Sequence, residues 1–206
     1  MSEKPIQSLL RIDASARLKT SITRELGSEI ITRLAALNPG LQIRHRDLAE
    51  GMPLLDEEWI NANMTQPAQR NPRQLARLAE SEGLVKEVEQ ADAIVLTVPI
   101  YNFSVPAVLK AWLDQICRVG LTFRYSEQGP EGLLADRPVY LVIASGGVPL
   151  GSPMDFASGY LRQVLGFIGI RDIRLVPAEC TNTDSAGARE RALESLREWL
   201  PRAETA

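Results

Sequence analysis

The sequence of 206 residues contains only one histidine, His45, and only two cysteines, Cys117 and Cys180. A lone histidine leaves no histidine-based metal cluster and no catalytic triad built on histidine. His45 falls on the polar phase of an alternating segment, where we expect a solvated side chain away from any site. The two cysteines lack metal-binding or redox spacing, so we expect two reduced thiols.

Long apolar runs and a strong net charge are also missing. The longest apolar runs are about as long as a strand, so we expect no membrane span. The first five residues, Met-Ser-Glu-Lys-Pro, do not resemble a signal peptide, which favours a cytoplasmic protein. A net charge of −3 argues against a general nucleic-acid binder. The length and the hydrophobic fraction of 45% predict one domain, residues 1–206.

The most informative stretch lies in the middle of the chain. Ala93–Val98 is a β-branched apolar run, typical of a strand that is covered on both faces, and Pro99 should end it. Val105–Ile116 has apolar residues at helical spacing. The loop of residues 100–104 therefore follows the carboxyl end of a buried strand, where ligands bind in open α/β sheets. From spacing alone, an ordinary connection whose aromatic residues cap the core is equally compatible.

Strand and helix patterns alternate five times along the chain. This alternation predicts a doubly wound parallel sheet with helices on both faces, and five strands fit the flavodoxin-like order 2-1-3-4-5. Residues 48–72 form a long excursion with a short helix near its middle, and residues 120–137 predict a hairpin or lid. The expected strands are Ser8–Asp13, Leu41–Asp47, Ala93–Val98, Val139–Ala144 and Ile173–Ala178, and the expected helices are Ser21–Leu37, Arg73–Gln90, Val105–Ile116, Phe156–Ile168 and Ala186–Leu200.

Hydroxyl side chains gather where the first helix begins, at Ser15, Thr20, Ser21 and Thr23. The amino end of a helix offers unpaired N–H groups and a positive partial charge, so this loop suits a phosphate monoester. Simple N-capping by Thr20 or Ser21 explains the same residues. The loop contains no Gly-x-Gly-x-x-Gly and no Walker Lys-Ser/Thr, so dinucleotides and nucleoside triphosphates are poorly supported.

A third loop, residues 144–147, follows the fourth expected strand. Its glycines let backbone N–H groups approach the edge of a flat ring, although glycine-rich turns after strands are common. Such donors can stabilise the negative charge of a reduced flavin. Together the three loops describe a phosphate end, a ring face and a ring edge, which predicts a flavin mononucleotide (FMN) site.

Three segments resemble one known family. They are Pro-Ile-Tyr-Asn-Phe, Leu-Thr-Phe-Arg-Tyr-Ser-Glu-Gln-Gly-Pro-Glu-Gly-Leu and Gly-Phe-Ile-Gly-Ile. They closely resemble the FMN-dependent NADH-azoreductases, also called NADH:quinone oxidoreductases. The resemblance covers nearly the whole chain and implies a flavodoxin-like homodimer with one FMN per subunit.

The resemblance also implies roles for residues of the three loops. Phosphate-binding positions match Ser15, Ser21, Ile22 and Thr23; the loop along the isoalloxazine matches Ile100, Tyr101, Asn102 and Phe103; and the pyrimidine-edge segment matches Ala144, Ser145, Gly146 and Gly147. The chain departs from the family pattern at several of these positions. Ile100 stands for Met, Ile22-Thr23 for Gln-Ser, and Ala144-Ser145 for Ser-Arg. Backbone contacts should survive these changes, whereas substrate range, nicotinamide preference and flavin potential can differ.

The implied function is transfer of electrons from NADH or NADPH through FMN to quinones and aromatic azo compounds, with ping-pong kinetics and no catalytic side chain. Trp59, Phe123 and Tyr125 are candidates for a substrate-contacting lid near a dimer interface. Two alternatives stay open. One is a flavodoxin-type electron carrier without NAD(P)H-dependent activity of its own, and the other is a binding or scaffold protein on the same fold with an empty site.

Overall fold

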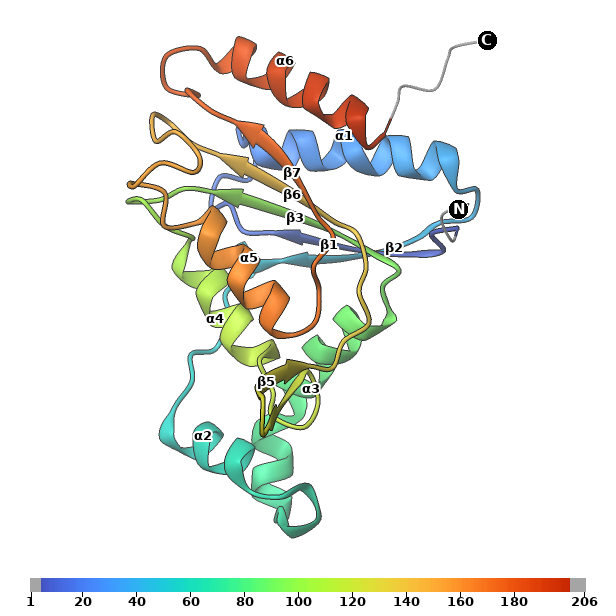
Figure 1. The fold of residues 1–206 in the computed structure, drawn as a ribbon, viewed down its shortest axis with the longest axis vertical. Coiled ribbons are helices and arrows are strands. Elements are labelled where there is room, and N and C mark those ends of the chain that lie inside the picture. Colours follow the sequence, from blue (N-terminus) through green and yellow to red (C-terminus); the bar gives the residue numbers. More distant parts are fainter. Residues whose placement is uncertain (1–4, 201–206) are drawn as a thin grey trace.

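A computed structural model describes residues 5–200 of the chain. Its centre is a five-stranded parallel sheet with the order β2-β1-β3-β6-β7 (Figure 1). The strands of this sheet are β1 (Ser8–Asp13), β2 (Gln42–Asp47), β3 (Ala93–Pro99), β6 (Val139–Ala144) and β7 (Ile173–Ala178). Two further strands, β4 (Phe123–Ser126) and β5 (Gly129–Gly132), pair antiparallel as a separate hairpin. The expected order 2-1-3-4-5 counted only the parallel strands, so the hairpin shifts the numbering of the last two.

Helices cover both faces of the sheet, which confirms the expected flavodoxin-like α/β architecture (Figure 1). One face carries α1 (Ile22–Leu37) and α6 (Ser185–Ser195), and the other carries α3 (Pro72–Gln90), α4 (Ala107–Ile116) and α5 (Ser158–Phe167). A short helix, α2 (Glu57–Met64), lies beyond the sheet, and single 3₁₀ turns occur at Leu48–Glu50, Pro67–Gln69 and Leu196–Glu198. Within residues 5–200, the structure has no helix with the length and apolar character that a bilayer crossing requires.

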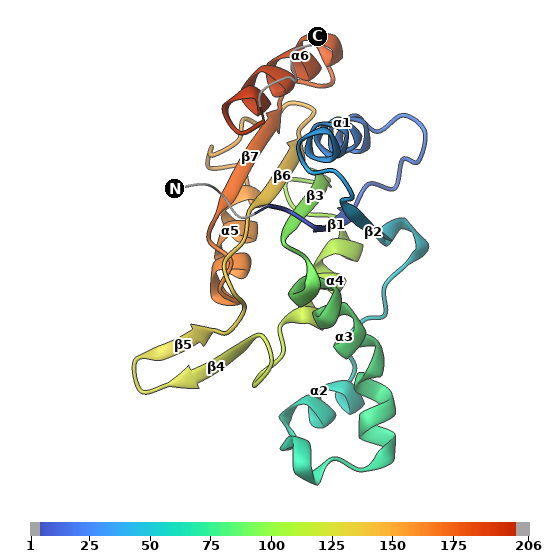
Figure 2. The ribbon, with the colours of Figure 1, turned by 90° about the vertical axis from the view of Figure 1, so that its right-hand side faces the viewer.

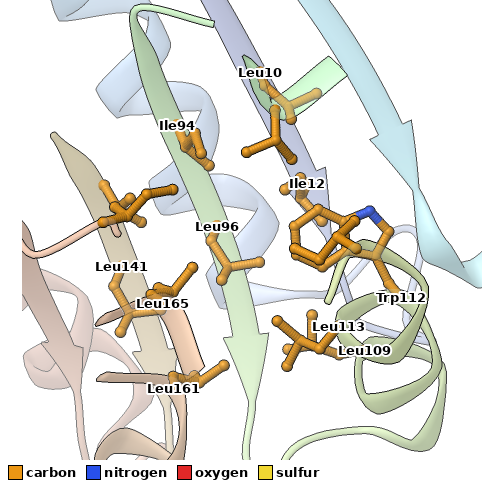
Figure 3. Close-up of a cluster of buried hydrophobic side chains, with 14 of the residues drawn as sticks. Leu10, Ile12, Ile94, Leu96, Leu109, Trp112, Leu113, Leu141, Leu161 and Leu165 are labelled. Carbon is orange, nitrogen blue, oxygen red and sulfur yellow. The ribbon is translucent and has the colours of Figure 1, made fainter. Parts of the chain in front are cut away.

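The alternation of side chains along each strand divides the interior into two cores. Leu10 and Ile12 of β1 lie beside Trp112 of α4, and Leu141 of β6 lies beside Leu161 and Leu165 of α5, all within one core (Figure 3). Leu9 points to the opposite face and packs under α1 and α6. Each fully buried aliphatic side chain contributes about 1.5–3 kcal/mol relative to exposure. The sheet is therefore fixed between two helical layers, and its carboxyl edge holds the loops that follow the strands.

Local capping explains where several helices begin. Ser21 caps α1 by accepting a hydrogen bond from the Arg24 amide at 3.4 Å, and Asn71 forms a capping box with Gln74 on α3. The helix α5 begins at Ser158, two residues later than expected, because the Asp155 carboxylate accepts the amides of Ala157 and Ser158 (both 2.9 Å). The side chain thus supplies the acceptors that the first turn of a helix lacks.

An extension formed by α2 and the adjoining half of α3 projects from the lower end of the sheet, and the β4–β5 hairpin projects separately beside it (Figures 1 and 2). The fully buried Arg118 joins α2 to α3. Its Nε donates to Asn63 Oδ1 (2.8 Å), and its Nη1 donates to Ser81 Oγ (2.8 Å). Its guanidinium also lies 5.7 Å from the centre of the Trp59 ring. The extension is therefore a packed part of the molecule with its own small core.

Candidate active site

A pocket lies at the carboxyl ends of β1, β3 and β6, where four loops meet. Of the residues that the sequence predicted, it brings together Ser15, Ser21, Ile22, Thr23, Ile100, Tyr101, Ala144 and Gly146. Asn102, Phe103, Ser145 and Gly147 belong to the same loops but do not line the pocket. Thr20, one of the hydroxyl residues expected where the first helix begins, also lines it, together with five further residues: Arg17, Pro99, Thr181, Asn182 and Ser185.

The first loop places the amino end of α1 against the pocket. Ser21 is the N-cap, so the simple capping explanation is correct for its side chain, which also lies 3.0 Å from Thr23 Oγ1. Capping satisfies the Arg24 amide and leaves the amides of Ile22 and Thr23 at the open end of the helix. The buried Ser15 hydroxyl accepts the Arg17 amide at 3.2 Å. This end of the pocket combines helix amides, hydroxyls and a guanidinium, which is the donor set of an anion site.

The second loop turns sharply at Asn102 and Phe103, which both have positive φ (48° and 74°). Tyr101 and Ser104 exchange two backbone hydrogen bonds across this turn (2.9 and 3.1 Å). Left-handed backbone at a bulky residue costs of order 1–3 kcal/mol, so the surroundings must hold it. The Phe156 amide does so by donating to the Phe103 carbonyl (3.0 Å). Asn102 and Phe103 therefore lie on the exposed rim beside the pocket.

The third loop is fixed by Ser145. Its hydroxyl donates to the Val148 carbonyl (2.5 Å) and accepts the Val148 amide (2.7 Å), so the side chain closes a turn and is not directed at the pocket. Ala144 and Gly146 line the pocket on either side of it. Gly147 lies past this edge, in open space.

The fourth loop was missed by the sequence analysis. The Thr181 amide donates to the Ser145 carbonyl (3.0 Å), and the Asn182 amide donates to the Gly146 carbonyl (3.2 Å). The Asn182 side chain occupies the space that a side chain at position 146 would need, since a Cβ there would lie 2.4 Å from Nδ2. The sequence signal that could have predicted this loop is the run of polar residues between the last strand and the Asp184 N-cap. Those residues also follow the carboxyl end of a parallel strand, where ligands bind.

A cluster of charged side chains lies beneath the first loop, on the α1 side of the sheet. Asp13 is fully buried, and His45 Nε2 lies 2.8 Å from its Oδ2. The expectation that His45 is solvated and remote was therefore incomplete. Its ring is half exposed, but it is bonded to the residue that ends β1. Nearby, the Arg24 guanidinium holds the pKa of Asp47 below its ordinary value, and the Asp47 carboxylate raises the pKa of Arg24.

Comparisons with known proteins agree with this architecture. Residues 7–200 match the family model described as the flavodoxin-like fold. The FMN-dependent NADH:quinone oxidoreductase 1 of Hahella chejuensis is 49% identical over 85% of this chain and 86% of its own length. A protein of the same description from Thiobacillus denitrificans is 45% identical over 94% of this chain and 95% of its own. The chain belongs to the flavodoxin-like FMN-dependent NADH:quinone oxidoreductase family.

Solved structures related to this family have the same fold. The azoreductase of Bacillus anthracis strain Sterne superposes with a TM-score of 0.82 at 25% identity, over 93% of this chain and 96% of that one. An FMN-dependent NADH-azoreductase from B. anthracis strain Ames Ancestor, solved in complex with FMN, also gives 0.82, at 23% identity and the same coverage.

The residues of the pocket fit the cofactor after which this quinone oxidoreductase family is named. Its anion end contains Ser15, Arg17 and the amide end of α1, and its walls at Ile100 and Ala144 are apolar. Gly146 leaves the Asn182 amide room to lie against the backbone between the third and fourth loops. Among the lining residues of the described chain there is no carboxylate, histidine or cysteine, so the pocket offers hydrogen-bond donors and ring contacts rather than an acid–base pair.

The three residues proposed for a lid do not line this pocket. Trp59 is 3% exposed and packs with Ala62 and Leu78, because the apolar stripes of α2 and α3 face each other. Phe123 is also buried, with its ring centre 4.3 Å from that of Phe167. Tyr125 is 72% exposed on the hairpin and meets the Phe123 ring edge-on at 5.6 Å. Of the three, Tyr125 alone is available to a partner.

The cysteines and the acidic residues do not form a second reactive centre in residues 5–200. Burial, assisted by Asp114, raises the pKa of Cys117 to about 11, so its thiol stays protonated. Cys180 is exposed on the fourth loop. No group of three or more histidine, cysteine or acidic side chains in this part of the chain is placed to hold a metal ion.

Proposed function

We propose that this chain binds one FMN per subunit in the four-loop pocket and transfers electrons from NADH or NADPH to quinones and aromatic azo compounds. The observation that carries the proposal is the convergence of the α1 amino end, the Tyr101 loop and the Gly146 loop on one pocket at the carboxyl edge of the sheet. The relatives and structural neighbours described above are named quinone oxidoreductases and azoreductases, which supports the same chemistry.

Each loop would hold a different part of the cofactor. Ser15, Ser21, Ile22 and Thr23 would bind the phosphate. Ile100 and Tyr101 would lie along the isoalloxazine, with Asn102 and Phe103 on the rim beside it. Ala144 and Gly146 would face the pyrimidine edge, in the turn that Ser145 closes and Gly147 continues. When bound, FMN supplies reversible hydride chemistry that no side chain of the pocket can provide. The positive end of the α1 dipole favours a phosphate dianion at the first of these positions.

The chain itself binds and orients. The Tyr101 hydroxyl accepts the Ala16 amide (3.3 Å), so the phosphate loop and the ring loop are joined directly. The Ile100 amide donates to the Ala144 carbonyl (2.8 Å), which fixes the ring loop to the third loop. Tyr101 lines the pocket with a partly exposed side chain, and the exposed Phe103 and Phe156 are joined beside it by the hydrogen bond from the Phe156 amide to the Phe103 carbonyl. We propose that the nicotinamide and the acceptor use this side of the pocket in turn, which gives ping-pong kinetics.

We further propose that residues 1–206 form one FMN-binding domain and that two subunits assemble as a homodimer beside the active site. The support is exposed apolar side chains on the segments that project from the sheet: Leu54 before α2, Met64 at the end of α2 and Tyr125 on the hairpin are each more than 70% exposed. Large apolar side chains left exposed in this way are the kind of surface that an interface covers.

The test of the proposed function is to titrate cofactor-free protein with FMN and then measure NADH oxidation in the presence of benzoquinone. We expect saturable FMN binding and quinone-dependent NADH consumption. Tight FMN binding without NADH consumption would instead indicate the electron carrier, and absence of FMN binding would overturn the proposal.

A further inference from the structure

The buried Asp13 carboxylate is the centre of a polar cluster directly beneath the phosphate loop. Its Oδ1 accepts the Thr97 hydroxyl (2.7 Å). Its Oδ2 faces three cationic or donor groups: Arg11 Nε at 2.8 Å, His45 Nε2 at 2.8 Å and Arg24 Nη1 at 3.3 Å. An isolated buried carboxylate at this place would be costly and would repel an anion bound above it. The neighbouring arginines cancel that charge.

Arg24 differs from the other members because it also reaches the loop. It belongs to the first turn of α1, and its side chain is 12% exposed. Its guanidinium donates two hydrogen bonds to the Asp47 carboxylate at the end of β2 (2.6 and 2.7 Å). The same guanidinium donates through Nη2 to the Ser15 carbonyl (2.8 Å). One side chain therefore joins β2, the helix α1 and the loop that follows β1.

The contact with the Ser15 carbonyl orients a peptide group of the pocket. The carbonyl of Ser15 and the amide of Ala16 belong to the same planar unit, in which the C=O and the N–H point in opposite directions. Arg24 holds the carbonyl side, and the Tyr101 hydroxyl holds the amide side (3.3 Å). Without the guanidinium, this peptide would be held from one side alone, and the Ser15 end of the loop could rotate away from the anion position.

We propose that Arg24 is a positioning residue for the phosphate loop, and that the preference of the pocket for FMN over riboflavin depends on its contact with Ser15. This inference rests on the proposed function. The ring loops have hydrogen bonds of their own, between Ile100 and Ala144 and between Tyr101 and Ser104, so riboflavin, which lacks the phosphate, depends little on Arg24.

The chain offers a matched control on β2, the strand that carries the Asp47 partner of Arg24. Arg46 of β2 pairs through two nitrogens with the Glu87 carboxylate of α3, and it has no hydrogen bond or ion pair with residues 14–21. Arg46→Gln therefore removes a comparable arginine–carboxylate pair from the same edge of the sheet. A general loss of stability would affect Arg24→Gln and Arg46→Gln alike.

The experiment measures FMN and riboflavin dissociation constants for the cofactor-free wild type, Arg24→Gln, Arg24→Lys and Arg46→Gln. We expect Arg24→Gln to weaken FMN about tenfold or more and riboflavin less than about threefold, as loss of a charge-assisted hydrogen bond predicts. Arg24→Lys should not restore FMN affinity, because a lysine lacks the planar fork of donors that binds the Asp47 carboxylate and the Ser15 carbonyl at the same time. Arg46→Gln should leave the ratio of the two constants unchanged.

Three results would overturn the inference. They are an unchanged FMN affinity in Arg24→Gln, an equal loss for both flavins, and the same loss of selectivity in Arg46→Gln. If Arg24→Gln does not fold, Asp47→Asn takes its place. This substitution weakens the hydrogen bonds that hold the Arg24 guanidinium, while Asp13 keeps its partners. We then expect a smaller loss of FMN affinity relative to riboflavin affinity. A wild type that binds neither flavin would overturn the proposed function as well, whereas the other outcomes leave that function intact.

Discussion

Gly132 and Gly169 lie backbone against backbone at the root of the β4–β5 hairpin. A Cβ on Gly132 would lie 2.2 Å from the Gly169 nitrogen, and a Cβ on Gly169 would lie 2.4 Å from the Leu134 carbonyl oxygen. The Leu134 amide donates to the Ile168 carbonyl beside them (3.0 Å). Two of the segments that carried the family resemblance are therefore the two sides of one contact, which explains why they occur together.

Because of this contact, we predict that one added methyl group lowers the stability of the fold considerably. Gly132→Ala places its Cβ against backbone atoms that cannot rotate away, and we expect a loss of about 1–3 kcal/mol in the free energy of unfolding. Gly83→Ala is the control, because that glycine lies within α3 with no atom near its Cβ position, and alanine should stabilise the helix by up to about 1 kcal/mol. Denaturant unfolding measures both. Equal stability of Gly132→Ala and wild type would contradict the close packing.

A second prediction concerns the third and fourth loops. Gly146→Ala pushes its new methyl group into the Asn182 amide, which must leave its place beside the pocket. We expect FMN to bind several-fold more weakly, with little change in unfolding temperature, because the displaced amide is the end of an exposed side chain. Gly159→Ala on α5, which has open space at its Cβ, should leave FMN affinity at the wild-type value. The FMN dissociation constants of both variants test this, and equal values for Gly146→Ala and the wild type would contradict the role of the Asn182 amide.

A third prediction separates helix capping from phosphate binding at Ser21. Aspartate caps helices as well as serine does, so Ser21→Asp should preserve α1 and the unfolding temperature. Its carboxylate would nevertheless face the phosphate dianion, and FMN affinity should fall while riboflavin affinity is maintained. Titration of the cofactor-free variant with each flavin measures this. Equal FMN affinity in the variant and the wild type would refute the phosphate assignment.

A fourth prediction concerns assembly. Sedimentation at micromolar concentration should show a dimer, and Leu54→Glu should shift it toward monomer, because a charge would replace an apolar side chain that is 73% exposed just before α2. Leu37→Glu, at the far end of α1 and 53% exposed, is the matched control and should stay dimeric. A wild-type monomer with full quinone reductase activity would show that the interface is not needed.

The sequence predicted those features that depend on short segments. The bounds of β6 and β7 agree with expectation, because uninterrupted or alternating apolar runs between breakers leave little choice. The three predicted loops meet because parallel strands share a carboxyl edge. The features that were missed depend on distant partners. Trp59 is buried by Leu78 of another helix, and Asn182 is held at the pocket by the hydrogen bond from its amide to the Gly146 carbonyl.

The charged cluster shows the same limit. Asp13 and His45 occupy alternating positions in neighbouring strands, and such positions in a strand look solvent-facing when the sequence is considered alone. In the structure they lie beneath α1, and the arginine that completes the cluster comes from that helix. Register and helix placement together decide which polar residues meet, and no short segment contains that information.

The central claim is that the chain positions FMN between a nicotinamide donor and a quinone, without an indispensable acid or base of its own. The most direct measurement is anaerobic stopped-flow absorbance of the FMN-loaded protein, mixed first with NADH and then with benzoquinone. We predict that NADH abolishes the oxidised-flavin absorbance, that the quinone restores it, and that the first rate varies little between about pH 6 and 8. An unchanged spectrum with NADH, or a single-proton pH dependence that disappears together with activity in one FMN-replete variant, would contradict the account.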